Sequence, residues 1–557
     1  MRECPDFRDR DLLGDDRFLR EALVRSWPDL MDRQEGRLRA LGRWVAAEAD
    51  AAAAFTDREA PPRLIEGLEG GDPAARLVLN PRYAAIHREA YRHGMVGLNH
   101  GATPEPFLLT FTMGYLLSQG DISVHCPVTL TGAVALVLDR LAPQGARARW
   151  LEPMTRMDGT AWTGGTWATE KEGGSDVGAS TTVARERGQA YALSGLKFFC
   201  SNAGSDVAIA TARPEGAAAG SAGLGLYLVP RIRPDGAPNS YRIRRLKEKL
   251  GTRGLPTGEI DLTEAYAEEV APPPRGFKLM MEALEFSRVH NIFAAAGAQR
   301  RAFLEALGHA SRRTAFGAPI LSYPMVQSTL LDLQAELEAS VLLSLATAEA
   351  FDRVWQRDRA PAEEERAWLR LLVAAAKYRT ADQAVRSAST AIEVLGGVGY
   401  TEEYATARLL RDAQVLTVWE GTANIQALEL LRILAGPAQG AAILSARFSA
   451  LLEGLPSELQ DPAGPVRRLL DEIASAAAEL RSNPRRAQHL GKPLLDRTAD
   501  ALSAALLLDE AGHELANGNG RAAAVARRYI ARRLMHAQPE LAPGLAEAVL
   551  YCEPIAP

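Results

Sequence analysis

The periodicity of apolar residues changes twice along this chain, and that change limits the possible folds more than any single motif does. Apolar residues first recur at helical intervals, as in 17–54 and 80–93. From about Asp158 to Ala271 apolar and polar residues alternate with a period of two, which predicts β-strands. Helical spacing returns after three consecutive prolines at 272–274. A β-rich domain is therefore expected between two helical regions.

The same pattern places the individual elements. Two strongly apolar helices are expected before the β-rich region, at 107–117 and 126–141. Five strands are expected inside it, at 181–186, 190–196, 207–211, 224–229 and 241–244. Four helices are expected after it, at 277–307, 323–355, 361–394 and 422–435. Several of them are long and contain no proline beyond the first turn, which predicts a bundle of antiparallel helices.

The last part of the chain is rich in Ala, Leu and Arg, and helices are expected there at 466–480, 493–515 and 521–535. The fold class is therefore α+β with several domains. The expected domains are a helical domain at 1–157, a β domain at 158–274, a helical bundle at 275–436 and a helical extension at 437–557.

The composition is that of a soluble protein, and we expect a cytoplasmic location. The formal net charge of −5 gives no general attraction to nucleic acid. The N-terminus lacks the apolar core of a secretory signal, and no uninterrupted apolar run reaches the ~18 residues of a membrane span. The four cysteines have no metal-binding spacing. His125 and Cys126 lack further ligands nearby, so we expect structural roles for both and no metal site.

The segment 393–434 holds the residues best suited to chemistry. At Gly396 and Gly397 a bulky ligand can approach the backbone closely, because no Cβ stands in the way. Glu420 precedes a helix start at which Thr422 is placed to cap. A carboxylate beside such a turn suits proton abstraction. The alternative is an acidic residue near an ordinary helix N-terminus.

Five motifs resemble those of acyl-CoA dehydrogenases, and they occur in the order of that family. They are Thr169-Glu170 with Gly174-Ser175-Asp176, GLKFFCSN at 195–202, KLGTRG at 249–254, RTAFG at 313–317, and Gly396-Gly397 with WEGT at 419–422. Each motif alone is weak, but five in order are a strong resemblance. It implies the acyl-CoA dehydrogenase fold, with an N-terminal helical domain, a β-barrel-like middle domain and a bundle of long helices, here followed by an appended helical domain.

The resemblance also implies that the protein binds FAD. Small residues let the flavin ring and the pyrophosphate meet the backbone, and Ser201 matches the position whose hydroxyl donates near flavin N5. Arg313 matches an arginine that reaches FAD in a neighbouring subunit, where its planar fork can neutralise the pyrophosphate. The implied FAD contacts are Thr169, Gly174, Ser175, Phe199, Ser201, Arg313, Phe316, Glu393, Gly396, Gly397, Thr422 and Asn424.

The implied activity is the dehydrogenation of an acyl-CoA thioester. Glu420 would remove the proton α to the thioester carbonyl while the β-hydride passes to flavin N5. Some members carry the base at the position that Ser287 occupies here, so Glu420 is the sole candidate. Arg288, the next residue, is either a salt-bridged helix residue or a contact to the CoA or acyl group. The family further implies a homotetramer and an electron-transferring flavoprotein as electron acceptor.

Within the family the chain resembles the AidB-like branch, which belongs to the bacterial response to DNA alkylation. Glu393 stands where the β-oxidation enzymes usually have Gln, Phe199 stands where they usually have Trp, and the chain is longer. That branch implies weak dehydrogenase activity together with binding of double-stranded DNA by the C-terminal domain. A protective DNA-binding flavoprotein is therefore the alternative to a catabolic dehydrogenase.

The C-terminal extension departs from what DNA binding would require. Residues 441–557 carry 13 Lys/Arg and 14 Asp/Glu, a balance of 13 − 14 = −1. Segregation of charge is still possible, because Arg521, Arg528 and Arg532 fall on one helical stripe, roughly opposite Ile530 and Leu534. If DNA binds, we expect phosphate contacts from this stripe, with Arg485 and Arg486 as further candidates. The alternative for the stripe is the solvated face of a surface helix.

Overall fold

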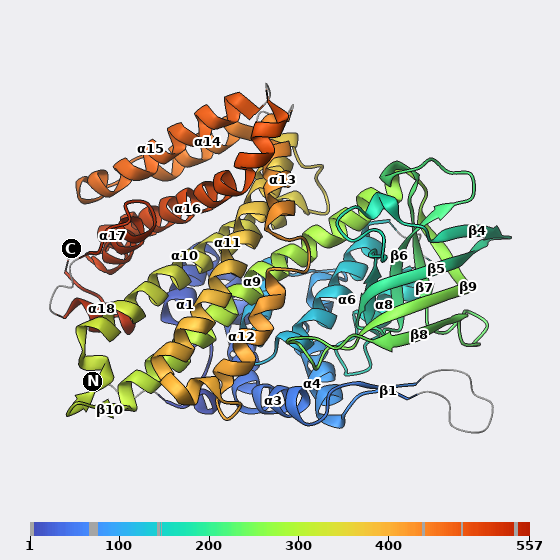
Figure 1. Ribbon diagram of the computed structural model, residues 1–557, viewed down its shortest axis with the longest axis horizontal. Coiled ribbons are helices and arrows are strands. Elements are labelled where there is room, and N and C mark those ends of the chain that lie inside the picture. Colours follow the sequence, from blue (N-terminus) through green and yellow to red (C-terminus); the bar gives the residue numbers. More distant parts are fainter. Residues whose placement is uncertain are drawn as a thin grey trace. The chain divides into compact units, whose positions relative to one another are not determined.

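The computed structural model describes residues 5–65, 76–141, 145, 147–436, 440–480, 483–539 and 544–556 (Figure 1). The chain forms two compact units. One comprises Glu48–His290, and the other comprises Met1–Ala47 together with Asn291–Pro557. This division follows compactness, so the domain boundaries expected at 157, 274 and 436 stay predictions.

The helices of the first unit, 48–290, precede its sheet in sequence. They are α3 (Asp50–Arg58), α4 (Pro81–Arg92), α5 (Phe107–Ser118), α6 (Ile122–Leu141) and α8 (Glu152–Met154), and the unit also contains the start of α9 (Arg275–Arg312). Helices α5 and α6 are buried almost throughout, as their continuous apolar sequences predict.

Helix α6 contains a segment, Ile122–Arg140, that by length and composition is apolar enough to cross a membrane, although polar residues interrupt its apolar run. In the structure 94% of its most apolar window is buried inside the protein. The core helix of a soluble protein has the same length and composition, so burial rather than composition distinguishes the two cases.

The middle domain is a barrel-like sheet of seven strands. These are β3 (Gly164–Trp167), β4 (Val183–Arg187), β5 (Ala190–Ser201), β6 (Val207–Pro214), β7 (Gly225–Pro230), β8 (Tyr241–Leu246) and β9 (Thr257–Ala271). Strands β6, β4, β5, β9 and β7 pair in a closed ring, while β3 joins β6 and β8 joins β9. Trp167, Leu193, Tyr227 and Ile260 fill its core. The five expected strands are confirmed, whereas β3 and β9 were not expected.

The second unit is a bundle of long helices (Figure 1). It contains α1 (Arg17–Ser26), α2 (Pro28–Trp44), the rest of α9, α10 (Pro324–Val354), α11 (Glu363–Leu395), α12 (Ala405–Leu416) and α13 (Ala423–Ala435). Its C-terminal helices are α14 (Gly440–Leu452), α15 (Ser457–Leu480), α16 (Pro484–Ala516), α17 (Arg521–Arg533) and α18 (Leu545–Leu550). All four helices expected after the sheet are confirmed, with ends that differ by a few residues.

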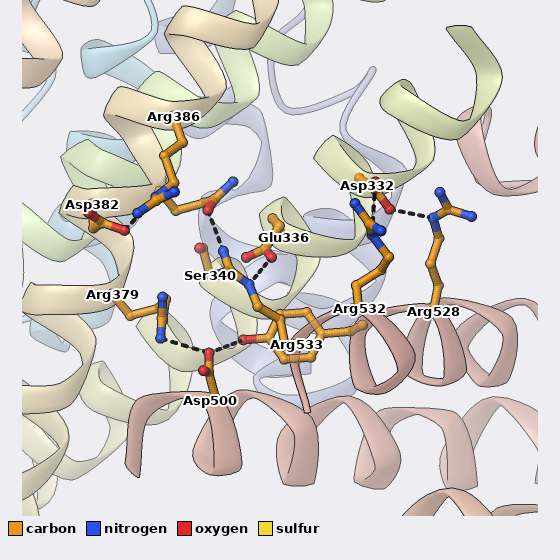
Figure 2. A network of polar contacts seen from close by, with 12 residues as sticks. Asp332, Glu336, Ser340, Arg379, Asp382, Arg386, Asp500, Arg528, Arg532 and Arg533 are labelled. Atoms are coloured by element: carbon orange, nitrogen blue, oxygen red, sulfur yellow. Dashed lines mark hydrogen bonds and ion pairs between the residues drawn. The ribbon is translucent and has the colours of Figure 1, made fainter. Parts of the chain in front are cut away.

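The C-terminal extension packs on α10 and α11 through ion pairs (Figure 2). The Arg528 guanidinium donates to Asp332 at 2.8 Å, and Arg533 pairs with Glu336 on the same helix, α10. On α11, Arg379 lies 2.7 Å from Asp500 of α16. These buried and half-buried pairs tie the extension to α10 and α11.

Candidate active site

The turn between α12 and α13 carries Glu420 in a conformation that few non-glycine residues adopt. Glu420 has φ 59° and Gly421 has φ 103°, so two consecutive residues lie in the left-handed region. Such a conformation costs about 1–3 kcal/mol at a non-glycine residue and persists only where surrounding contacts hold it. The Glu420 side chain is half-buried, and its Oε2 atom is enclosed by protein.

Contacts on both sides of Glu420 hold this turn. Before it, the Trp419 indole donates to Asn291 Oδ1 at 2.9 Å, and the Asn291 amide donates to the Leu416 carbonyl at 3.1 Å. After it, the Gln426 amide donates to the carbonyls of Glu420 and Gly421, both at 3.2 Å. The backbone conformation of the candidate base is therefore fixed by α9 and α13.

The residues that follow Glu420 begin α13 at the surface. Thr422 occupies the N-cap position as expected, but its hydroxyl makes no capping hydrogen bond. The expectation that Thr422 caps the helix through its side chain was therefore wrong. Thr422 and Asn424 are both exposed, so their polar groups face away from the core of this unit.

The Gly-Gly turn at the end of α11 is also exposed. Gly396 ends the helix with φ 71°, which explains a glycine at that position. A Cβ built at either glycine would have no atom within 4 Å, but the backbone of Gly397, unlike that of Gly396, needs no left-handed conformation. Within the described chain nothing requires a glycine at 397, so its small size fits a group or chain that would lie against it. Glu393, one turn earlier, is exposed as well.

Arg313 and Phe316 lie on a short hairpin formed by β10 (Thr314–Ala315) and β11 (Ala318–Pro319). Phe316 has φ 51° and is 98% exposed. The Tyr323 hydroxyl holds the hairpin by donating to the carbonyls of Ala315 and Phe316, at 2.8 Å and 3.1 Å. Arg313 is also exposed. The hairpin therefore presents a phenyl ring and a guanidinium to the outside.

In the unit 48–290 a buried ion pair joins the motif loop at 169–176 to strand β5. Lys197 Nζ lies 2.7 Å from Glu170 Oε1, and both side chains are buried. Glu170 also accepts hydrogen bonds from the Thr181 amide at 2.6 Å and the Thr182 hydroxyl at 2.6 Å. Burial alone would raise the pKa of Glu170, but the Lys197 ammonium and these hydrogen bonds hold it below its ordinary value. The loop that carries the candidate flavin residues is thus anchored near its start, at Glu170.

The loop itself presents small groups to solvent. Gly174 and Ser175 are exposed, and Thr169 is half-buried beside them, with its carbonyl accepting from the Phe198 amide at 2.9 Å. The sequence reasoning missed Lys197, although a lysine in an apolar strand is a signal that a partner acid must be near.

Phe199 and Ser201 lie at the C-terminal end of β5. Phe199 is 54% exposed, and its ring meets that of Phe198 edge-on with centroids 5.2 Å apart. The Lys247 ammonium lies 3.2 Å from the Phe198 centroid and 4.7 Å from that of Phe199. The Ser201 hydroxyl lies 3.4 Å from that of Thr257. An exposed aromatic face next to a half-buried hydroxyl suits a planar heterocycle.

Ser287 and Arg288 lie on α9. The Ser287 hydroxyl is buried and donates to the Ala283 carbonyl at 3.2 Å, while Arg288 is half-buried. Further along, His290 Nδ1 lies 3.1 Å from His125 Nε2 inside the protein, where burial lowers the pKa of His125 to about 3. His125 and Cys126 are both buried, and the structural roles expected for them stay predictions.

The expected arginine stripe is wrong for two of its three residues. Arg521 is 2% exposed and Arg528 is 7% exposed, since α17 packs against both α16 and α10. Arg521 pairs with the buried Glu338, and Arg528 pairs with Asp332, so neither can reach a phosphate. Arg532 is more exposed and lies 3.3 Å from the same Asp332. Helical periodicity showed one face of α17 but could not show that acids on α10 cover that face. Arg485 and Arg486 are exposed.

Most of the chain is similar to known proteins. Residues 274–435 match the C-terminal domain of acyl-CoA dehydrogenases, residues 165–265 match their middle domain, and residues 3–158 match the N-terminal domain of the adaptive response protein AidB. The putative acyl-CoA dehydrogenase AidB of Escherichia coli is 34% identical over 376 residues, which cover 66% of each chain.

Solved structures extend the similarity to the C-terminal helices. Acyl-CoA dehydrogenase family member 11 of Caenorhabditis elegans is 29% identical over 470 residues, 81% of this chain and 76% of its own. The crystal structure of Caenorhabditis elegans ACDH-11 in complex with C11-CoA superimposes with a TM-score of 0.87, at 26% identity, and covers 95% of this chain and 92% of that one. An acyl-CoA dehydrogenase of Bacillus anthracis complexed with FAD has the same fold, with a TM-score of 0.70 at 16% identity over 85% of this chain and 90% of that one.

Proposed function

Because the chain belongs to the acyl-CoA dehydrogenase family, we propose that it is an FAD-dependent oxidoreductase that dehydrogenates an acyl-CoA thioester, with Glu420 as the base. The observation that carries the proposal is the turn at Glu420. Its carboxylate is half-buried in a backbone conformation that Trp419 and Gln426 hold from both sides. A general base must be placed accurately, and a water-poor surrounding favours proton transfer.

The residues fit FAD by shape and by chemistry. Gly397 has open space where a Cβ would stand, and the exposed Phe199 ring offers a stacking surface beside the Ser201 hydroxyl. Thr169, Gly174 and Ser175 would contact the cofactor from the loop that Glu170 anchors. The further FAD contacts that the family resemblance implies are all exposed in the other unit; they are Arg313, Phe316, Glu393, Gly396, Thr422 and Asn424. When bound, FAD supplies the two-electron chemistry by accepting a hydride at N5.

The chain's own residues would do the rest. Glu420 would take up the proton α to the thioester carbonyl, and Ser201 would donate a hydrogen bond to the cofactor. Arg313 would neutralise phosphate charge through its planar fork. Arg288, half-buried on α9, stays a candidate contact to the CoA or acyl group.

We further propose a homotetramer as the assembly, with an electron-transferring flavoprotein as acceptor. Phe316 is 98% exposed on its hairpin, and Met325 and Tyr400 of the same unit are also largely exposed. Burial of these large apolar side chains under another chain would be favourable, which supports an assembly. A second copy would supply that cover and would bring Arg313 to a neighbour's cofactor.

The alternative is an AidB-like protein that binds double-stranded DNA. Its support is the match of residues 3–158 to the AidB N-terminal domain. The arginine stripe no longer supports it, because Arg521 and Arg528 are buried in ion pairs. A titration with duplex DNA at low salt decides between the two, since phosphate contacts are strongest there.

The proposal is tested by anaerobic mixing of the purified flavoprotein with a panel of acyl-CoAs. We expect flavin absorption in the native protein, bleaching of that absorption by at least one acyl-CoA, and loss of the bleaching in Glu420→Gln. Loss of a general base lowers the rate by about 10²–10⁴-fold. If Glu420→Gln bleaches as fast as the wild-type protein, Glu420 is not the base.

A further inference from the structure

A buried lysine on α11 ends at the turn that carries Glu420. Lys377 is 1% exposed, and its Nζ donates to the Gly421 carbonyl at 2.7 Å. Lysine is almost never fully buried unless it is paired, because an ammonium loses its hydration inside a protein. We therefore expect the buried ammonium of Lys377 to make a polar contact that an apolar side chain could not make.

The contact made by Lys377 supplies such a reason. The Gly421 carbonyl accepts from Lys377 and also from the Gln426 amide, which donates to the Glu420 carbonyl as well. Both carbonyls on the C-terminal side of the candidate base are thereby fixed in direction. Glu420 and Gly421 are the two residues with positive φ, a conformation that must be held by such contacts.

The two sides of the turn are held from different helices. Trp419 is tied to Asn291 of α9, whereas Gly421 is tied to Lys377 of α11 and Gln426 of α13. The direction in which the Glu420 side chain leaves the backbone depends on both of these attachments. An ammonium is the strongest of the donors to the Gly421 carbonyl, because hydrogen bonds from charged donors are about twice as strong as neutral ones.

We propose that Lys377 is a positioning residue for Glu420: its ammonium holds the Gly421 carbonyl and keeps the Glu420–Gly421 turn in the conformation that aims the carboxylate. The inference rests on the proposed function, in which Glu420 is the base. Lys377 acts through the backbone of the turn and does not touch the substrate.

The test compares Lys377→Met with wild type, since methionine has nearly the same length and shape but no donor. Lys492→Met is the control for the same substitution at an exposed lysine, because Lys492 of α16 donates to the hydroxyl of Tyr378, the neighbour of Lys377 on α11, and not to the turn. We expect the flavin content of Lys377→Met to be unchanged and its rate of flavin reduction by acyl-CoA to fall by about 10–100-fold, since a small misplacement of a catalytic group costs up to about 10²-fold. The acyl-CoA concentration at half-maximal rate should change little, and Lys492→Met should behave as wild type.

A structural measurement separates this inference from the proposed function. In a crystal structure of Lys377→Met we expect φ of Glu420 to leave the left-handed region, whatever the activity. A wild-type rate in Lys377→Met, or a slow rate with φ unchanged, would overturn the positioning role. If none of the acyl-CoAs reduces the flavin of the wild-type protein, the proposed function fails. The crystal structure of Lys377→Met still tests whether Lys377 holds the turn. Should Lys377→Met not fold, two other variants test the same contact. Lys377→Gln removes the charged donor to the Gly421 carbonyl, and Gln426→Leu removes the amide donor.

Discussion

The Lys197 ammonium lies 2.7 Å from the Glu170 carboxylate, and neither side chain reaches solvent. The pair connects two segments that sequence motifs had marked separately as flavin-binding, the loop at 169–176 and the strand β5. Lys197 also donates to the Thr211 carbonyl at 2.7 Å, so the ammonium is shared between the loop and β6. The loop that presents Gly174 and Ser175 is thus held by the core of the barrel.

Replacing Glu170 by Gln should destabilise the protein and weaken FAD binding. Removing one partner of a buried pair costs about 3–5 kcal/mol, because the other charge stays buried without compensation. Thermal unfolding and FAD titration measure the two effects. Glu172→Gln is the control, since Glu172 is exposed in the same loop. Recovery of stability in the double variant Glu170→Gln with Lys197→Met would confirm that the uncompensated charge is the cause, and equal stability of Glu170→Gln and wild type would contradict it.

Replacing Arg521 by Gln should lower stability and leave any DNA affinity unaltered. Its guanidinium pairs with the buried Glu338 and donates to the Val549 carbonyl at 3.2 Å. Loss of this pair costs about 3–5 kcal/mol. Arg527→Gln is the control, because Arg527 is exposed on the same helix and donates to the Glu458 carbonyl at 3.0 Å. Denaturant unfolding measures the difference. A variant as stable as wild type, with a flatter salt dependence of DNA binding, would restore the original stripe hypothesis.

The sequence predicted most of the elements and the motif residues, but not the partners of buried charges. Strand β3 is a run of only four residues, Gly-Gly-Thr-Trp, which is too short to show alternation. In β9 only a few apolar residues alternate with polar ones, and the strand carries several acids. Helix α15 begins at Ser457, nine residues before the expected start at 466. The sequence pattern placed the start too late because proline usually breaks a helix, and Pro462 and Pro465 lie inside this one.

The contacts of Lys197, Lys377 and Arg521 join segments far apart in the chain, and no local pattern specifies such pairs. Glu420 could be found from the sequence because its motif is local. Its left-handed conformation could not, because that depends on contacts from α9 and α11.

Replacing Phe316 by Ala should weaken the assembly. Burial of a phenyl ring that is 98% exposed stabilises an interface by about 1.5–3 kcal/mol. A symmetric oligomer repeats the same contact in each subunit. Light scattering across a dilution series should show a smaller mass for Phe316→Ala than for wild type. Ile232→Ala is the control, because Ile232 is an apolar residue that is 46% exposed in the unit 48–290, whereas the hairpin belongs to the other unit. A wild-type protein that is monomeric and fully loaded with flavin would contradict the assembly proposal.

Acid should destabilise the protein through the buried pair His125 and His290. Burial lowers the pKa of His125 from 6.5 to about 3 and lowers that of His290 well below 6.5. Each folded-state pKa lies below the unfolded value, so the unfolded chain binds more protons once the pH falls below about 6.5. Stability is then fully present above pH 6.5 and is lost as the pH falls toward the folded-state pKa values, at up to about 1.4 kcal/mol per pH unit for each histidine.

Thermal unfolding between pH 7 and pH 5 should show a shallower loss of stability in His125→Gln than in wild type, whatever the stability of the variant at pH 7. His513→Gln, at an exposed position, should keep the wild-type slope. If His125→Gln keeps it too, the buried pair does not titrate on unfolding in this range.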